Sequence, residues 1–174
     1  ITGDYCFNDL TVSSKGDVYL TESLTNRIFI LPARSDSIRA FAQPEGHTFL
    51  NGITLSPNEK TLFVSSTESL LTLNIESGKI SPLPYLPAIS PQPVDGLTFY
   101  QNSLIGHQSN KVSRFYLNEA MDAILHHKTI DSIGLDGSTT GELGINGWYY
   151  YIGNSQLTSG IDYGKMEIMP WDSL

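Results

Sequence analysis

Residues 51–66 read NGITLSPNEKTLFVSS, and this stretch indicates the fold. An Asn and a turn-forming Gly open it, and a strand that alternates apolar residues with Thr follows. SPNEK then supplies the Pro and Asn of a tight turn, and the apolar run TLFVSS reads as a second strand. Two strands joined by a short turn predict an antiparallel hairpin.

The same pattern occurs twice more along the chain. One copy, NDLTVSSKGDVYLTES, starts at Asn8, and another, DGLTFYQ, starts at Asp95, so the three copies begin 43 and 44 residues apart. A repeat of about 40–45 residues is typical of a β-propeller blade, whereas helical repeats would need long helices that this sequence lacks. We therefore predict an all-β fold, a β-propeller.

Strand patterns predict four blades within one domain over residues 1–174. The approximate blade boundaries are residues 7–45, 49–84, 94–133 and 140–171. The fourth copy, ELGINGWYYYIGNSQ, is weaker. Its Gly153 lies 11 residues after Glu142, as Gly106 lies 11 after Asp95, and this spacing predicts that Glu142 occupies the position of Asp95. Apolar spacing in LNEAMDAILHH predicts one short surface helix over residues 117–127, with Asn118 as its N-cap. The proline-rich residues 82–93 are expected to form a rim loop, with a PxxP ligand as the alternative.

Composition excludes several classes of function. The 174 residues carry 10 basic and 18 acidic side chains, a net charge of −8, and no Lys/Arg run, which argues against nucleic-acid binding. Apolar runs are short, so no transmembrane span is expected. A lone cysteine, Cys6, excludes an internal disulfide and is expected to be a small buried residue. HExxH, GxSxG and phosphate-binding glycine motifs are absent. No feature of the sequence points to a compartment or an oligomeric state.

Oxygen-bearing side chains open all three clear repeats. Because equivalent first strands surround the central channel of a propeller, Asn8, Asn51 and Asp95 are expected to converge on its axis. Hard oxygen ligands on rigid strands suit Ca²⁺ or another divalent cation. The alternative is that each side chain caps a turn by bonding its own backbone, although recurrence in register favours the metal. Glu142 is a looser candidate ligand in the fourth blade, and Asp9 is expected either to add an oxygen or to orient Asn8.

The histidines give weaker signals. His107 ends a second strand and is expected either to approach the channel or to pack in the core. His126 and His127 are adjacent, which does not suit a shared ligand on a helix, so solvated surface positions are expected.

The three repeats resemble successive blades of the SMP-30/gluconolactonase/LRE-like family, which is related to paraoxonases and strictosidine synthase-like proteins. The resemblance covers most of residues 7–157. That family forms six-bladed propellers with a divalent metal, often Ca²⁺, in the channel. Its ligands are the Asn of an ND blade, the Asn of an NG blade, the Asp of a DG blade and a Glu from the first blade. The resemblance therefore implies that Asn8, Asn51 and Asp95 are metal ligands.

The resemblance also implies what surrounds these residues. The four blades would be the last four of a six-bladed ring, with the chain incomplete at its N-terminus and the glutamate ligand upstream. An open arc would leave apolar blade faces uncovered, so the chain is expected to be poorly stable or to associate.

The implied function is a Ca²⁺-dependent hydrolase of lactones or related esters, with Asp95 as ligand and as the carboxylate that activates water. Its partner would be a small-molecule lactone or ester. The alternative is a non-catalytic binding module with a structural Ca²⁺, since the paraoxonase-type histidine pair has no counterpart here and a propeller alone does not decide function.

Overall fold

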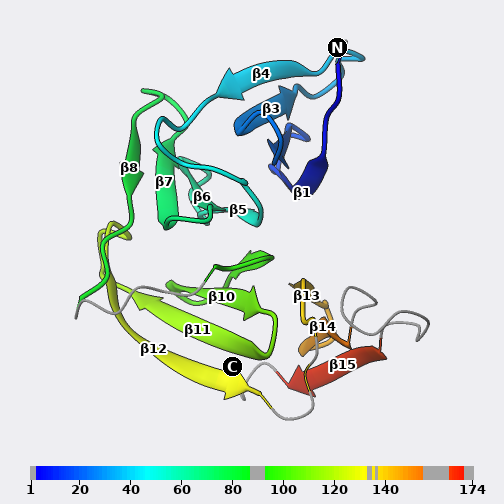
Figure 1. The fold of residues 1–174 in the computed structure, drawn as a ribbon, viewed down its shortest axis with the longest axis vertical. Helices are drawn as coiled ribbons and strands as arrows, with labels where there is room; N and C mark the ends of the chain where they lie inside the picture. The colour runs from blue at the N-terminus through cyan, green and yellow to red at the C-terminus, as the bar shows by residue number, and fades with distance from the viewer. Residues whose placement is uncertain (1–2, 87–92, 133–134, 136, 155–164, 171–174) are drawn as a thin grey trace. The chain divides into compact units, whose positions relative to one another are not determined.

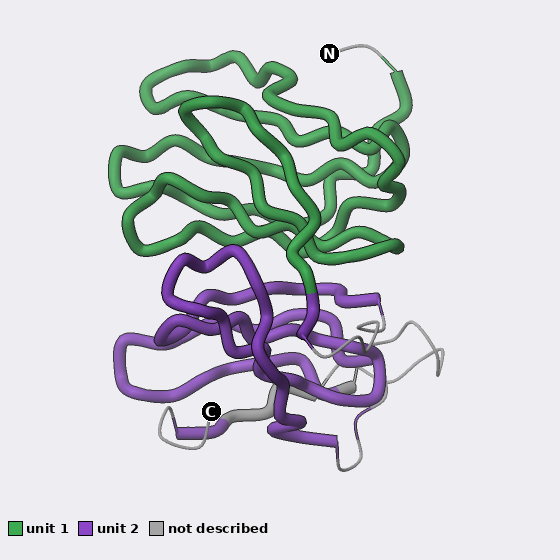
Figure 2. Tube along the Cα trace, turned by 90° about the vertical axis from the view of Figure 1, so that its left-hand side faces the viewer, with its two compact units in different colours: residues 1–84 green, residues 85–174 purple. Residues whose placement is uncertain are grey.

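The computed structural model describes residues 3–86, 93–132, 135, 137–154 and 165–170. These residues form four antiparallel sheets (Figure 1), which confirms the predicted all-β propeller with four blades. The described part of the chain contains no helix that could cross a membrane. Two compact units, Ile1–Pro84 and Tyr85–Leu174, contain two sheets each (Figure 2).

Unit 1 contains the first two blades, and both are four-stranded with strands in sequence order. The first blade consists of β1 (Phe7–Val12), β2 (Val18–Glu22), β3 (Arg27–Leu31) and β4 (Arg39–Ala42). The second consists of β5 (Ile53–Leu55), β6 (Thr61–Ser65), β7 (Leu70–Asn74) and β8 (Ile80–Pro82). The strands lie where the alternating pattern predicted them, because turns rich in Gly, Pro and Asn separate them.

Unit 2 contains the other two blades. The third consists of β9 (Leu97–Phe99), β10 (Ser103–Gln108), β11 (Lys111–Leu117) and β12 (Ile124–Asp131). The described strands of the fourth are β13 (Gly141–Leu143), β14 (Trp148–Asn154) and β15 (Lys165–Pro170). Each strand pairs with its neighbour in sequence, so the sheets are meanders without crossovers.

Apolar packing between the two sheets of unit 1 forms its core. The first sheet contributes Tyr19, Ile28 and Ile30, and the second contributes Ile53, Leu62, Val64, Leu71 and Leu73. All of these side chains are at least 94% buried. Burial of branched side chains on facing sheets is the main stabilising contribution here, and truncating one of them to Ala should cost about 2–5 kcal/mol.

The opposite face of the first sheet is apolar, and it is exposed along β1. Cross-strand pairing aligns Leu10 with Leu20 and Val12 with Val18, as it aligns Ile53 with Val64 and Leu55 with Leu62 in the second sheet. In the second sheet this face is buried. In the first sheet the equivalent face is exposed, because Leu10 and Val12 are each 54% exposed.

Unit 2 has a core around two stacked tyrosines of β14, Tyr149 and Tyr151, which pack with Ile105 and Val112. The loop before β9 approaches the neighbouring sheet closely: Gly96 N–H donates to the Thr139 carbonyl at 2.7 Å. A Cβ at Gly96 would lie 2.7 Å from that same oxygen, so only glycine fits.

Two sequence expectations are wrong. Residues 118–123 form a turn rather than part of a helix, and β12 begins at Ile124. Asn118 closes this turn by accepting hydrogen bonds from Asp122 N–H and Ala123 N–H. Cys6 is exposed rather than buried. Within the proline-rich stretch, residues 87–92 lie outside the described residues.

Candidate functional site

The first hairpin of each blade defines equivalent positions in all four copies. In each blade one N–H closes the hairpin by donating to a carbonyl across the turn: Ser13 to Asp17, Ser56 to Thr61, Tyr100 to Ser103 and Gly144 to Trp148. Five residues before these donors stand Asn8, Asn51, Asp95 and Thr139. The three predicted ligands therefore occupy one register. The fourth copy presents Thr139 there, and Glu142 lies within β13, three residues further along.

Asn51 has the most informative environment of the three. Its N–H donates to the Ser65 carbonyl at 3.0 Å, and its carbonyl accepts from the Thr21 hydroxyl at 2.5 Å. Its Oδ1 is buried and has no hydrogen-bond partner among the described residues. A buried acceptor without a partner costs about 1–3 kcal/mol, so such an atom in a native fold is expected to bind a water molecule or an ion. If Asn51 only capped a turn, this oxygen would accept a backbone N–H, and none of the described N–H groups donates to it.

Asn8 is exposed, and a short relay orients its amide. The Ser23 hydroxyl donates its one proton to the Leu50 carbonyl at 2.7 Å. The same hydroxyl oxygen must then accept from Asn8, so the contact at 3.1 Å involves Asn8 Nδ2. Asn8 Oδ1 consequently faces away from Ser23. The relay also joins Asn8 to the residue that precedes Asn51.

Asp9 ties the first sheet to the second. One carboxylate oxygen accepts from Leu10 N–H at 2.9 Å, and the other accepts from Ile53 N–H at 3.0 Å. Leu10 lies in β1 of the first sheet and Ile53 in β5 of the second, so the Asp9 carboxylate bonds to the backbone of both sheets. The aspartate of the ND pair thus fixes the position of the NGI strand relative to β1.

Asp95 begins the first hairpin of unit 2 in the same backbone setting as Asn51. Asp95 N–H donates to the His107 carbonyl at 2.7 Å, and His107 N–H donates to the Gly96 carbonyl at 3.1 Å. Asn51, Ser65 and Gly52 make the matching pair of bonds. The case for Asp95 as a ligand rests on this shared register and on its carboxylate.

His107 is part of the core, and its imidazole is uncharged at neutral pH. The side chain is fully buried, with Nδ1 at 2.8 Å from the Ser138 hydroxyl and Nε2 at 2.6 Å from the Tyr149 hydroxyl. Burial lowers the pKa of His107 to about 3. Of the adjacent pair, His126 is exposed as predicted, whereas His127 is half-buried and hydrogen-bonds to the Tyr85 hydroxyl.

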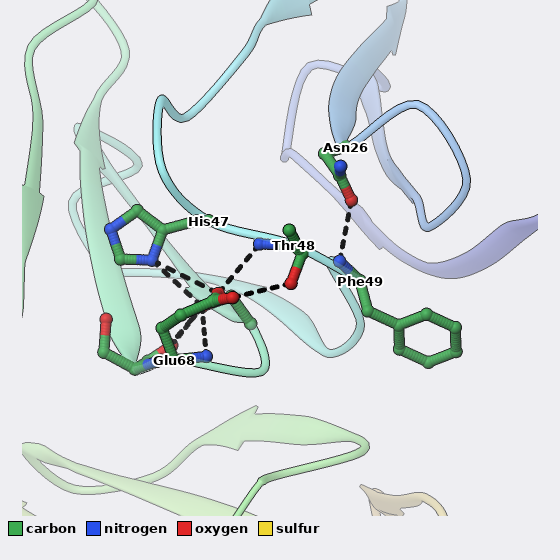
Figure 3. Close-up of polar contacts among 7 residues, drawn as sticks. Asn26, His47, Thr48, Phe49 and Glu68 are labelled. Carbon is green, nitrogen blue, oxygen red and sulfur yellow. Dashed lines mark hydrogen bonds and ion pairs between the residues drawn. The ribbon is translucent and has the colours of Figure 1, made fainter.

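Two glutamates hold the segments that lead into Asn8 and Asn51. The Glu68 carboxylate accepts from Thr48 N–H at 2.8 Å and from the Thr48 hydroxyl at 2.6 Å (Figure 3). These bonds lower the pKa of Glu68 to about 2. Burial by itself raises the pKa of Glu22, but bonds from the Thr25 hydroxyl and from N–H groups including that of Cys6 outweigh it and lower the pKa. The sequence carries a signal for these two glutamates, because each is the middle residue of a tripeptide TES, at 21–23 and 67–69.

Within the described residues, no three His, Cys, Asp or Glu side chains gather to hold a metal ion. A cation at the predicted site would therefore depend on amide oxygens. Asn51 Oδ1 and Asn8 Oδ1 are such donors, and carbonyl-type oxygens suit Ca²⁺. Amide oxygens, together with the Asp95 carboxylate, are donor types that Ca²⁺ accepts.

The amino-acid sequence matches no protein-family model and no curated protein. Its fold is similar to that of a gluconolactonase from Xanthomonas campestris (TM-score 0.67, 16% identity, 88% of this chain and 58% of that chain). It is also similar to a chain of the nidogen/laminin complex (0.68, 14%, 91% and 59%). A third similar structure is virginiamycin B lyase from Staphylococcus aureus (0.63, 17%, 97% and 57%). This chain thus spans less than three-fifths of each, and identities this low show a β-propeller fold alone.

Proposed function

We propose that this chain belongs to a Ca²⁺-dependent hydrolase of lactones or related esters, with Asn8, Asn51 and Asp95 as the ligands of the cation. The observation that carries the proposal is the buried Asn51 Oδ1 without a hydrogen-bond partner in the described structure. It stands at the register shared with Asn8 and Asp95, two further oxygen-bearing residues. The fold similarity to a gluconolactonase supports the same choice of chemistry.

Each residue has a distinct part in this proposal. The two asparagines orient neutral oxygens, and Asp95 supplies the one formal negative charge. When bound, Ca²⁺ would polarise the ester carbonyl and stabilise negative charge on its oxygen. Asp95 would accept a proton from the attacking water and return it to the departing oxygen as the ester C–O bond breaks, so that a lactone gives a hydroxy acid. A cation lowers the basicity of a ligand carboxylate, so this second role requires Asp95 to loosen its contact with the ion.

A second candidate is a binding module in which Ca²⁺ only stabilises the channel. The environment of His107 favours it. Both ring nitrogens are hydrogen-bonded within the core, so this residue, the nearest histidine to Asp95 in sequence, is not available to move protons for a reaction.

A lactone panel assayed with added Ca²⁺ and with chelator tests the proposal. Turnover that requires Ca²⁺, falls in Asn51→Ala and survives in Asn74→Ala supports the hydrolase. Asn74 is a matched control because its Oδ1 accepts bonds from Ser77 in a turn. Ca²⁺ binding by calorimetry without turnover of any lactone would support the binding module. Absence of both would refute the metal site.

A further inference from the structure

The backbone at Phe49 has an unusual conformation. Its φ is +51°, in the left-handed region where a Cβ crowds the backbone. Asn26, with φ of +57°, is a residue type that visits this region readily, whereas a bulky aromatic residue is a genuine outlier there. Glycine would adopt the same conformation without steric cost. At this φ the Cβ of Phe49 therefore carries a steric cost that glycine would not carry.

The fold covers Phe49 only in part. The residue is 52% exposed, so about half of its surface stays in contact with water. The next residue, Leu50, is fully buried and anchors the loop in the core of unit 1. The chain thus has a core anchor at Leu50 and does not need a second apolar side chain at Phe49.

Hydrogen bonds hold the Phe49 loop on both sides. Phe49 N–H donates to Asn26 Oδ1 at 2.7 Å, and Thr48 is clamped by the Glu68 carboxylate. On the other side, the Leu50 carbonyl accepts from the Ser23 hydroxyl. Figure 3 shows the ring of Phe49 directed away from His47 and Glu68. Strain that surrounding contacts maintain is characteristic of residues retained for function.

The Phe49 loop leads directly into the proposed metal site. Asn51 follows two residues later, and the Ser23 hydroxyl that bonds Leu50 also orients Asn8. We propose that Phe49 is a ligand-recognition residue, whose ring binds the apolar substituent of a lactone or ester that has its carbonyl group at Asn8 and Asn51. The inference rests on the proposed function for the place of the ligand. It adds a substrate class, compounds with an aromatic or alkyl substituent.

Stability measurements test whether the ring is structural. Phe49→Gly is expected to melt at the same temperature as the wild type or higher, because the strained Cβ is removed. Phe49→Tyr is expected to melt as the wild type does. A fall in the melting temperature of Phe49→Gly by several degrees would show that the ring supports the fold and would overturn the proposal.

Recognition is tested with two lactones that differ in one substituent, γ-phenyl-γ-butyrolactone and unsubstituted γ-butyrolactone, in the presence of Ca²⁺. For the phenyl compound, KM is expected to rise about tenfold in Phe49→Gly and to stay unchanged in Phe49→Tyr. For the unsubstituted compound both variants should match the wild type. Leu24→Ala is the control, because Leu24 is also an exposed apolar residue of unit 1. Equal effects of Phe49→Gly on both lactones would refute the proposal.

Calorimetry with the unreactive lactams 5-phenyl-2-pyrrolidinone and 2-pyrrolidinone separates this inference from the hydrolase proposal. Suppose that neither lactone is hydrolysed, yet the phenyl lactam binds the wild type and Phe49→Tyr about tenfold more tightly than Phe49→Gly. Recognition by Phe49 would then stand while the hydrolase proposal fails. If the wild type does not bind the phenyl lactam more tightly than the unsubstituted one, Phe49 has no recognition role.

Discussion

Asn8 donates from Nδ2 to the hydroxyl oxygen of Ser23 at 3.1 Å, and this contact determines where Asn8 Oδ1 points. The direction follows from proton counting, because the single Ser23 proton goes to the Leu50 carbonyl. An amide orientation that the local sequence leaves open is thus set by a residue 15 positions away.

Replacing Ser23 by Ala should release the Asn8 amide and leave the Leu50 carbonyl without its hydroxyl donor. We expect the free energy of unfolding to fall by about 1–2 kcal/mol and Ca²⁺ affinity to fall several-fold. Titration calorimetry measures the affinity. Ser77→Ala, which removes an exposed turn hydroxyl bonded to Asn74, should leave Ca²⁺ binding unchanged. Equal affinities for Ser23→Ala and the wild type would contradict the proposed role of the relay.

Asn51→Ala should have opposite effects with and without the cation. In chelator, the variant removes a buried oxygen that has no partner among the described residues, so stability should stay constant or rise by about 1 kcal/mol. With Ca²⁺, the wild type should gain stability through binding and the variant should not. Denaturant unfolding under both conditions measures the difference. A clear loss of stability in chelator would mean that the Asn51 side chain serves the fold.

Asp95→Asn should weaken Ca²⁺ binding more than Asn8→Ala or Asn51→Ala does. The proposed site has one formal negative charge, and the substitution removes that charge while keeping a similar shape. We expect a loss of at least about tenfold in affinity, equivalent to about 1.4 kcal/mol. The ranking of the three dissociation constants decides the matter, and a larger effect of either alanine variant would argue against Asp95 as the principal ligand.

Stability should fall on acidification below about pH 6.5 because of His107. The pKa of His107 is about 3 in the fold and 6.5 in the reference state, so the unfolded chain binds more protons between these values. The contribution is full above pH 6.5 and is lost as the pH falls towards 3. His107→Gln should flatten the decline between pH 6.5 and 4.5, whereas the exposed control His126→Gln should not. Below pH 4.5, protonation of Glu68 adds a further loss, since its pKa is about 2 in the fold.

The open face of the first blade should cause self-association. Leu10 and Val12 are each 54% exposed at positions whose counterparts in the second blade face the core. Leu10→Glu with Val12→Glu should shift the chain towards monomer in sedimentation experiments while changing its stability little. Leu24→Glu tests specificity, because Leu24 is 58% exposed but lies in the turn between β2 and β3 rather than in β1. Equal effects of both changes would mean that association is unspecific.

The sequence by itself determined the blades and the shared register of Asn8, Asn51 and Asp95. Period-two alternation and turns made of Gly, Pro and Asn are local signals, and each repeat contains its own copy. The same reasoning failed over residues 117–127. The apolar residues there come from the end of β11, a turn and the start of β12, and together they imitate helical spacing.

Only the tertiary structure decided the details of the candidate site. Counting from Gly153 aligned Glu142 with Asp95, but hairpin hydrogen bonds place Thr139 there, because register depends on backbone pairing and not on residue count. The orientation of Asn8 depends on Ser23, 15 positions away, and the clamped backbone of Phe49 depends on Asn26, 23 positions away. The bonds from Ser23 to Leu50 and from Phe49 to Asn26 join different repeats, so they form only when the first two blades pack together, and no local pattern encodes them.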